Sequence, residues 1–219
     1  MNTQSLVLHV SPAAGNVSAE YIIPEKSICM MTLAHGAGAG MNHAFMASLT
    51  NALAENGIAT LRFNFPFMEN KKGPPDKPAV AHKTIEAAIN KAQELFPFLP
   101  LFVAGKSFGG RMSSQYLSEH NNTKVKGIIF YGFPLHPPGK PSADRAEHLK
   151  HVKQPMLFLQ GTKDELATWN LIEPVCSSLK RATLVKIEGA GHSFKAGKRD
   201  TVSELVRETH NWIHKKLKK

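Results

Sequence analysis

From residue 28 onward, short apolar segments that suit β-strands alternate with amphipathic segments that suit helices. The strand-like segments span residues 28–34, 58–63, 101–104, 127–131, 156–160 and 182–187. The helix-like segments span residues 43–56, 79–95, 108–120 and 143–150, with one more between the last two strands and another beginning near Thr201. This alternation predicts an α/β fold in which helices cover both faces of a mostly parallel sheet. Ligands of such sheets bind beyond the carboxyl ends of the strands, so the residues after each strand are candidates for function.

Capping and helix-breaking residues predict where several elements begin and end. Asn42 is the expected N-cap of the helix over 43–56, and Gly57 is the expected stop. The sequence Thr-Val-Ser-Glu at 201–204 matches a capping box at the start of the last helix. Residues 66–78 hold four prolines and a glycine, which predicts an irregular surface loop. Residues 6–10 and 19–23 are expected to form an antiparallel pair at the edge of the sheet.

Composition excludes several classes of protein and predicts one domain over residues 1–219. Hydrophobic residues make up 42% of the chain, which is enough to bury a core, and no apolar run is long enough to span a membrane. The N-terminus lacks the basic region of a signal peptide, and Cys29 and Cys176 allow one disulfide at most, so we expect a cytoplasmic protein. The net charge of +10 is diffuse apart from a lysine-rich end, so we do not expect nucleic acid as a partner.

The segment from Gly105 to Gly109 matches the G-x-S-x-G pattern of a nucleophile elbow. It lies between a predicted strand and a predicted helix, the context in which a sharp turn presents the hydroxyl of Ser107 above the sheet edge. A phosphate-binding P-loop is the other interpretation of Gly105-Lys106-Ser107. That motif needs a glycine where Pro100 stands, and the residues in between are apolar strand, so we reject the P-loop.

A second glycine-rich segment, from His35 to Gly40, follows a predicted strand. It fails as a dinucleotide-binding fingerprint because Met41 stands where the last glycine is required. Small residues suit an oxyanion loop, in which a backbone N–H acts together with that of the residue after the nucleophile. We therefore predict Ala37 and Phe108 as the oxyanion-hole donors, and a simple tight turn is the alternative.

An acid and a histidine follow the last two predicted strands. Asp164 lies just past the strand that ends at Gln160, where it could orient a histidine, with Glu165 as the second candidate. His192 follows Gly189-Ala-Gly191, a flexible segment able to place an imidazole over the sheet edge. The chain order Ser107, Asp164, His192 is that of α/β-hydrolases and differs from those of chymotrypsin and subtilisin.

These segments resemble the α/β-hydrolase superfamily, in particular its small dienelactone-hydrolase-like branch and a group of predicted hydrolases similar to testis-expressed protein 30. The resemblance spans residues 28–215 and rests on residues 33–40, 105–111, 161–164 and 189–192. It implies a three-layer fold of about eight strands, the second of them antiparallel, without a large cap domain. Dienelactone hydrolases carry cysteine where this chain has Ser107, so their particular substrate does not carry over.

The function expected from these residues is that of a serine hydrolase acting on a small carboxylic ester or thioester. Ser107 would be the nucleophile, His192 the base and Asp164 the residue that orients His192, with no metal or cofactor required. The alternative is a non-catalytic scaffold or interaction protein that reuses the fold. The sequence does not fix the oligomeric state.

Five residues near the carboxyl ends of the strands are candidates for substrate contact: His35, Gly36, Phe67, Arg111 and Phe133. Phe67 and Phe133 belong to apolar loops able to line an acyl pocket, and ordinary loop packing is the alternative. Arg111 could bind an acidic substrate group, and a structural or surface role is the alternative.

Overall fold

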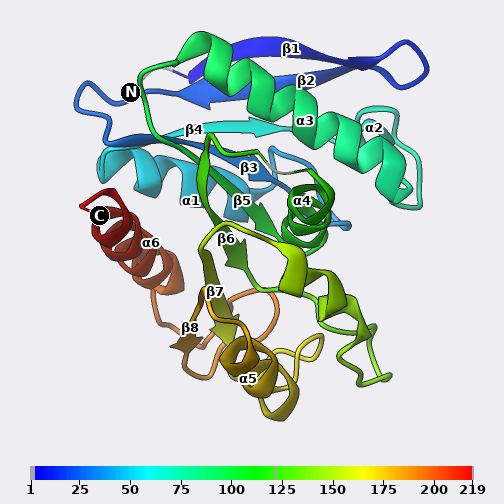
Figure 1. The fold of residues 1–219 in the computed structure, drawn as a ribbon, viewed down its shortest axis with the longest axis vertical. Helices are drawn as coiled ribbons and strands as arrows, with labels where there is room; N and C mark the ends of the chain where they lie inside the picture. Colours follow the sequence, from blue (N-terminus) through cyan, green and yellow to red (C-terminus); the bar gives the residue numbers. More distant parts are fainter. Residues whose placement is uncertain (1–2, 121, 219) are drawn as a thin grey trace.

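The computed structural model describes residues 3–120 and 122–218, and these form a twisted sheet between two layers of helices (Figure 1). The strand order is β1-β2-β4-β3-β5-β6-β7-β8. The strands are β1 (Thr3–Ser11), β2 (Gly15–Ile22), β3 (Cys29–Ala34), β4 (Ile58–Phe63), β5 (Leu101–Lys106), β6 (Val125–Tyr131), β7 (Met156–Gly161) and β8 (Ala182–Ile187). β2 alone runs opposite to the other strands, so the expected topology is confirmed for the described residues.

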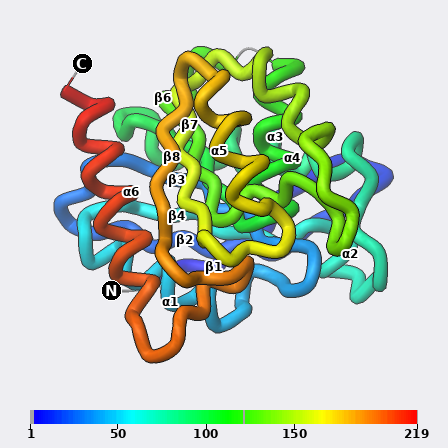
Figure 2. Tube along the Cα trace, turned by 90° about the horizontal axis from the view of Figure 1, so that it is seen from below, coloured from blue at the N-terminus to red at the C-terminus, as the bar shows by residue number. Residues whose placement is uncertain are grey.

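Helices cover both faces of the sheet, as Figure 2 shows with α6 on one side of the strands and α3, α4 and α5 on the other. The helices are α1 (Ala44–Glu55), α2 (Pro66–Glu69), α3 (Pro78–Leu95), α4 (Phe108–Glu119), α5 (Trp169–Ser178) and α6 (Thr201–Leu217), with a 3₁₀ helix η1 (Asp144–His151). Adjacent residues of β3 point to opposite faces: Met30 packs in the core that contains Ile85 of α3, and Met31 in the core that contains Leu49 of α1. The sheet therefore has two separate hydrophobic cores, one on each face.

Four local expectations need correction. The segment predicted as an irregular loop begins with the short helix α2, because Pro66 occupies its first turn, where a missing N–H costs nothing. The cap of α1 is His43, which accepts a hydrogen bond from Phe45 N–H, in place of Asn42. The N-cap of α6 is Asp200, which accepts a hydrogen bond from Ser203 N–H, so the helix is capped one residue before the predicted cap Thr201. The helix expected at 143–150 is a 3₁₀ helix.

The crossing of α4 over the carboxyl ends of β3 and β5 is tight enough to require glycine. A Cβ atom on Gly105 would lie 2.3 Å from the backbone nitrogen of Gly110, and one on Gly109 would lie 2.6 Å from the carbonyl oxygens of Ala34 and His35. These contacts are with backbone atoms, which cannot rotate away. The glycines of the G-x-S-x-G segment are therefore packing residues that bring the start of α4 against the sheet edge. Among the residues described, none of the helices is long and apolar enough to cross a membrane.

We predict that Gly105→Ala destabilises the fold by about 1–3 kcal/mol or more, because the added methyl group overlaps the backbone of α4. Urea unfolding monitored by circular dichroism measures this change. Gly73→Ala is the matched control, since a Cβ atom at Gly73 meets nothing within 4 Å, and its stability should stay within about 1 kcal/mol of wild type. Equal stabilities of the two variants would contradict the packing role of Gly105.

Candidate active site

Ser107 occupies the turn between β5 and α4 in a strained backbone conformation. Its φ of 51° and ψ of −116° lie in a region that residues other than glycine rarely adopt. The strain is held by the surroundings, because Ser107 N–H donates to the carbonyl of Tyr131 in β6 and Arg111 N–H donates to the carbonyl of Ser107. The turn leaves the side chain of Ser107 above the carboxyl edge of the sheet, as the elbow pattern predicts.

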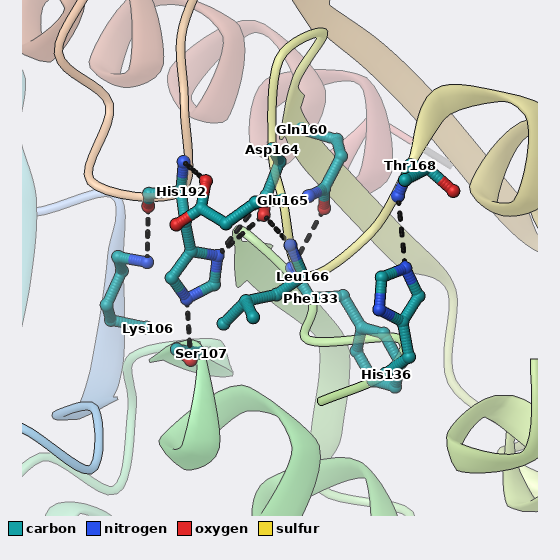
Figure 3. A network of polar contacts seen from close by, with 10 residues as sticks. All are labelled: Lys106, Ser107, Phe133, His136, Gln160, Asp164, Glu165, Leu166, Thr168 and His192. Carbon is teal, nitrogen blue, oxygen red and sulfur yellow. Dashed lines mark hydrogen bonds and ion pairs between the residues drawn. The ribbon is translucent and has the colours of Figure 1, made fainter. Parts of the chain in front are cut away.

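The structure brings Ser107, Asp164 and His192 into one chain of hydrogen bonds (Figure 3). The Oγ atom of Ser107 lies 2.8 Å from Nε2 of His192. On the other side of the ring, Nδ1 of His192 lies 2.8 Å and 3.0 Å from the two carboxylate oxygens of Asp164. A carboxylate can only accept, so Nδ1 carries the proton and Nε2 is left to accept from the serine hydroxyl.

Asp164 is buried, and both of its carboxylate oxygens accept hydrogen bonds. Its side chain is 1% exposed, and beyond His192 it accepts hydrogen bonds from Leu166 N–H (2.8 Å) and from Nε2 of Gln160 (2.6 Å). The other end of the Gln160 amide accepts from Phe133 N–H at 2.9 Å. Gln160 thus fixes the carboxylate of Asp164, a contact that sequence reasoning missed. The available signal was a polar residue at the end of the apolar run Met-Leu-Phe-Leu of β7.

Glu165, the second candidate for the acid, lies elsewhere. It is exposed, and its carboxylate accepts a hydrogen bond from the backbone N–H of His192 at 3.4 Å without reaching the imidazole. The acid that contacts the histidine ring is therefore Asp164.

An open cavity of about 450 Å³ lies in front of Ser107 and His192. One wall is the segment Gly36–Ala39, and the others include Phe45, Met46 and Leu166. Ala37 lies in this wall, and the N–H of Phe108 is the first of α4, so it has no acceptor within the helix. Both predicted oxyanion donors thus flank the serine, one in the cavity wall and the other next to Ser107 in the chain.

His35 does not line the cavity, contrary to its assignment as a substrate-binding residue. It is completely buried, and both ring nitrogens have partners inside the protein: Nδ1 donates to the carbonyl of Gly36 (2.7 Å) and Nε2 accepts from Phe65 N–H (3.0 Å). Burial lowers the pKa of His35 to about 4, so the ring stays neutral. His35 fixes the glycine-rich loop to the segment that follows β4.

Three other residues predicted to contact substrate are also absent from the cavity wall. Phe67 is buried against Phe65 and Phe108, and Phe133 is buried against aromatic side chains of β6 and β7. Arg111 lies on α4, and its Nε atom is buried without a hydrogen-bond partner among the described residues. Of the five predicted residues only Gly36 lines the cavity, and the start of α1 supplies side chains that sequence reasoning missed.

Among residues 3–120 and 122–218, no group of three or more His, Cys, Asp or Glu side chains is arranged to hold a metal ion.

The buried His35 predicts a dependence of stability on pH. Its pKa of about 4 lies below the ordinary value of 6.5, so between these values the unfolded chain binds the proton that the folded chain excludes. The free energy of unfolding therefore falls as the pH drops through this window. Relative to His35→Gln, which keeps an acceptor but does not titrate, wild type should lose about 3 kcal/mol between about pH 7 and pH 4.

Urea unfolding at a series of pH values measures this difference. His148 titrates in the same direction but is present in both proteins, so the comparison isolates His35. The exposed His9→Gln serves as the control and should follow wild type. A constant difference between wild type and His35→Gln across the range would contradict the buried, neutral state of His35.

Comparison with known proteins places this site in a family context. The profile described as an alpha/beta hydrolase domain matches residues 27–215. A dienelactone hydrolase from Anabaena variabilis superposes with a TM-score of 0.78 at 19% identity, covering 98% of each chain. XC6422 from Xanthomonas campestris, described as an α/β serine hydrolase without a lid, superposes with a TM-score of 0.75 at 22% identity, covering 97% of this chain and 95% of the other. An α/β serine hydrolase homologue from Coxiella burnetii gives a TM-score of 0.78 at 22% identity, covering 95% and 98%.

Proposed function

The chain belongs to the alpha/beta hydrolase family, and from that premise we propose that it is a serine hydrolase that cleaves a small carboxylic ester or thioester. The observation that carries this proposal is the chain of hydrogen bonds from Ser107 through His192 to Asp164, with 2.8 Å between Oγ and Nε2. The structurally similar dienelactone hydrolase and lidless serine hydrolase support the same reaction class. The finer likeness to proteins similar to testis-expressed protein 30 remains a prediction.

In the proposed first step, Nε2 of His192 takes the hydroxyl proton of Ser107 while Oγ attacks the substrate carbonyl carbon. The carbonyl π electrons move to the oxygen, giving a tetrahedral oxyanion. His192, now protonated, is stabilised by the carboxylate of Asp164 and passes the proton to the leaving alcohol or thiol. The bond to the leaving group breaks, and an ester on Ser107 remains.

In the second step, His192 takes a proton from a water molecule, which attacks the acyl carbon. Collapse of the second oxyanion breaks the bond to Oγ and returns the proton to Ser107, so the acid is released and the enzyme is regenerated. In this mechanism the N–H groups of Ala37 and Phe108 stabilise both oxyanions, each contributing on the order of 3 kcal/mol to lowering the barrier. The proposed chemistry needs no metal or cofactor.

The cavity favours a small substrate. Its volume is about 450 Å³, small residues form the wall nearest Ser107, and Phe45, Met46 and Leu166 offer apolar contact for an acyl group. Such a space suits a short acyl chain, and its open side leaves room for the alcohol or thiol to depart.

We predict that a fluorophosphonate probe labels the wild-type protein and that Ser107→Ala abolishes labelling. With 4-nitrophenyl esters and acyl-CoA thioesters as substrates, Ser107→Ala should lower kcat by about 10⁴-fold or more, and Asp164→Asn by about 10⁴-fold, because the amide favours the wrong tautomer of His192. Ser177→Ala, which alters an exposed serine of α5, is the control and should label and turn over like wild type. Folded wild-type protein that is neither labelled nor active would favour the non-catalytic scaffold.

A further inference from the structure

Lys106 is the last residue of β5 and directly precedes Ser107, yet the mechanism proposed above does not use its side chain. Its Nζ atom donates a hydrogen bond of 2.8 Å to the backbone carbonyl of His192, as Figure 3 shows. The same ammonium lies 5.3 Å from the ring centroid of Phe194, two residues further along that loop. Lys106 therefore joins the turn that carries the nucleophile to the loop that carries the histidine.

Few other contacts hold the backbone of His192. Its N–H donates to the exposed Glu165 carboxylate at 3.4 Å, a longer bond than the one from Lys106 to its carbonyl. Among the residues that the structure describes, the Lys106 bond is thus the shorter of the two hydrogen bonds made by this backbone. Because Lys106 and Ser107 are covalent neighbours, the bond fixes the histidine loop relative to the nucleophile itself.

The ammonium, the carboxylate and the imidazole meet around Gly132. A Cβ atom on this glycine would lie 3.3 Å from Nζ of Lys106, 3.6 Å from a carboxylate oxygen of Asp164 and 3.6 Å from Cε1 of His192. Gly132 has a φ of 73°, which suits glycine, and its missing side chain leaves the space in which the three groups converge. The charge of Lys106 is therefore next to the Asp164–His192 pair.

Burial and neighbouring charges act on this ammonium in opposite directions. Desolvation lowers the pKa of Lys106 to about 8, while the carboxylates of Asp164 and Glu165, on the loop after β7, oppose that shift. The third titratable group that faces Lys106 is His192, on the loop after β8. At neutral pH the side chain is mainly protonated, so it carries a positive charge beside the imidazole.

We propose that Lys106 is a positioning residue for the reaction: it holds the His192 loop against the nucleophile turn and places a positive charge beside the Asp164–His192 pair. This inference rests on the proposed hydrolase function. The hydrogen bond aligns Nε2 with the serine hydroxyl, and a misplacement of about 1 Å at such a contact costs on the order of 100-fold in rate.

The test compares Lys106→Met with wild type, because methionine fills similar space without a donor or a charge. The matched control is Lys163→Met, which removes an exposed lysine charge next to Asp164 in the chain. For each protein, kcat and KM for 4-nitrophenyl acetate are measured between about pH 5 and pH 9, together with the rate of inactivation by a fluorophosphonate. Thermal unfolding verifies that each variant is folded.

For Lys106→Met we expect kcat and the inactivation rate to fall about 10- to 100-fold with a smaller change in KM. In Lys163→Met kcat should stay at the wild-type value, since solvent screens an exposed charge. Lys106→Gln, which keeps a hydrogen-bond donor without the charge, should recover part of the lost kcat, and it replaces the methionine variant if that one does not fold.

The two proposals fail in different ways. Active wild type together with a Lys106→Met variant that retains the wild-type kcat and inactivation rate would overturn the role of Lys106 and leave the hydrolase function intact. Wild type that is inactive toward esters and unlabelled by the probe would overturn the hydrolase function, and the positioning role would fall with it.

Discussion

The close packing of the first turn of α4 against the ends of β3 and β5 determines the geometry of the whole site. Gly105 and Gly109 allow backbone to touch backbone there, where a methyl group would lie 2.3 Å and 2.6 Å from its neighbours. At the same turn Ser107 has a positive φ, and Gly36 of the glycine-rich loop lies next to it. His35, buried beneath that loop, fixes its position through both ring nitrogens. The strained backbone of Ser107 is thus held by its hydrogen bonds to Tyr131 and Arg111.

A second constraint is the burial of the Asp164 carboxylate. An unpaired charge in this position would be costly, and the fold surrounds it with the imidazole of His192, the backbone N–H of Leu166 and the amide of Gln160. Gln160 in turn accepts from Phe133 N–H, so the hydrogen bonds extend from the cavity into the core of the sheet. Such a network orients the acid and the histidine before any substrate arrives, which is the preorganisation that the proposed mechanism requires.

The sequence predicts those residues of the site whose position is set by the end of a strand. Ser107 directly follows β5, and Asp164 and His192 lie in the loops after β7 and β8, so the parallel strands bring all three residues to one edge of the sheet. Contacts that depend on side-chain direction were not predictable: His35 and Phe67 point into the core, while Phe45 and Met46 of α1 reach the cavity. Gln160 and Lys106 were missed because each makes a hydrogen bond to backbone in a loop far away in the sequence, that of Phe133 and that of His192. The short helix α2 was also missed, because the many prolines after β4 indicated a loop while Pro66 in fact begins a helix.

The central claim is that Ser107 becomes covalently acylated during turnover. Intact-protein mass spectrometry after rapid acid quenching of wild type with a 4-nitrophenyl ester tests it most directly, with peptide mapping to locate the adduct. The account predicts a mass increase equal to one acyl group, carried by the peptide that contains Ser107, together with a burst of 4-nitrophenol close to one equivalent. Turnover without any adduct, or an adduct on a different residue, would contradict it.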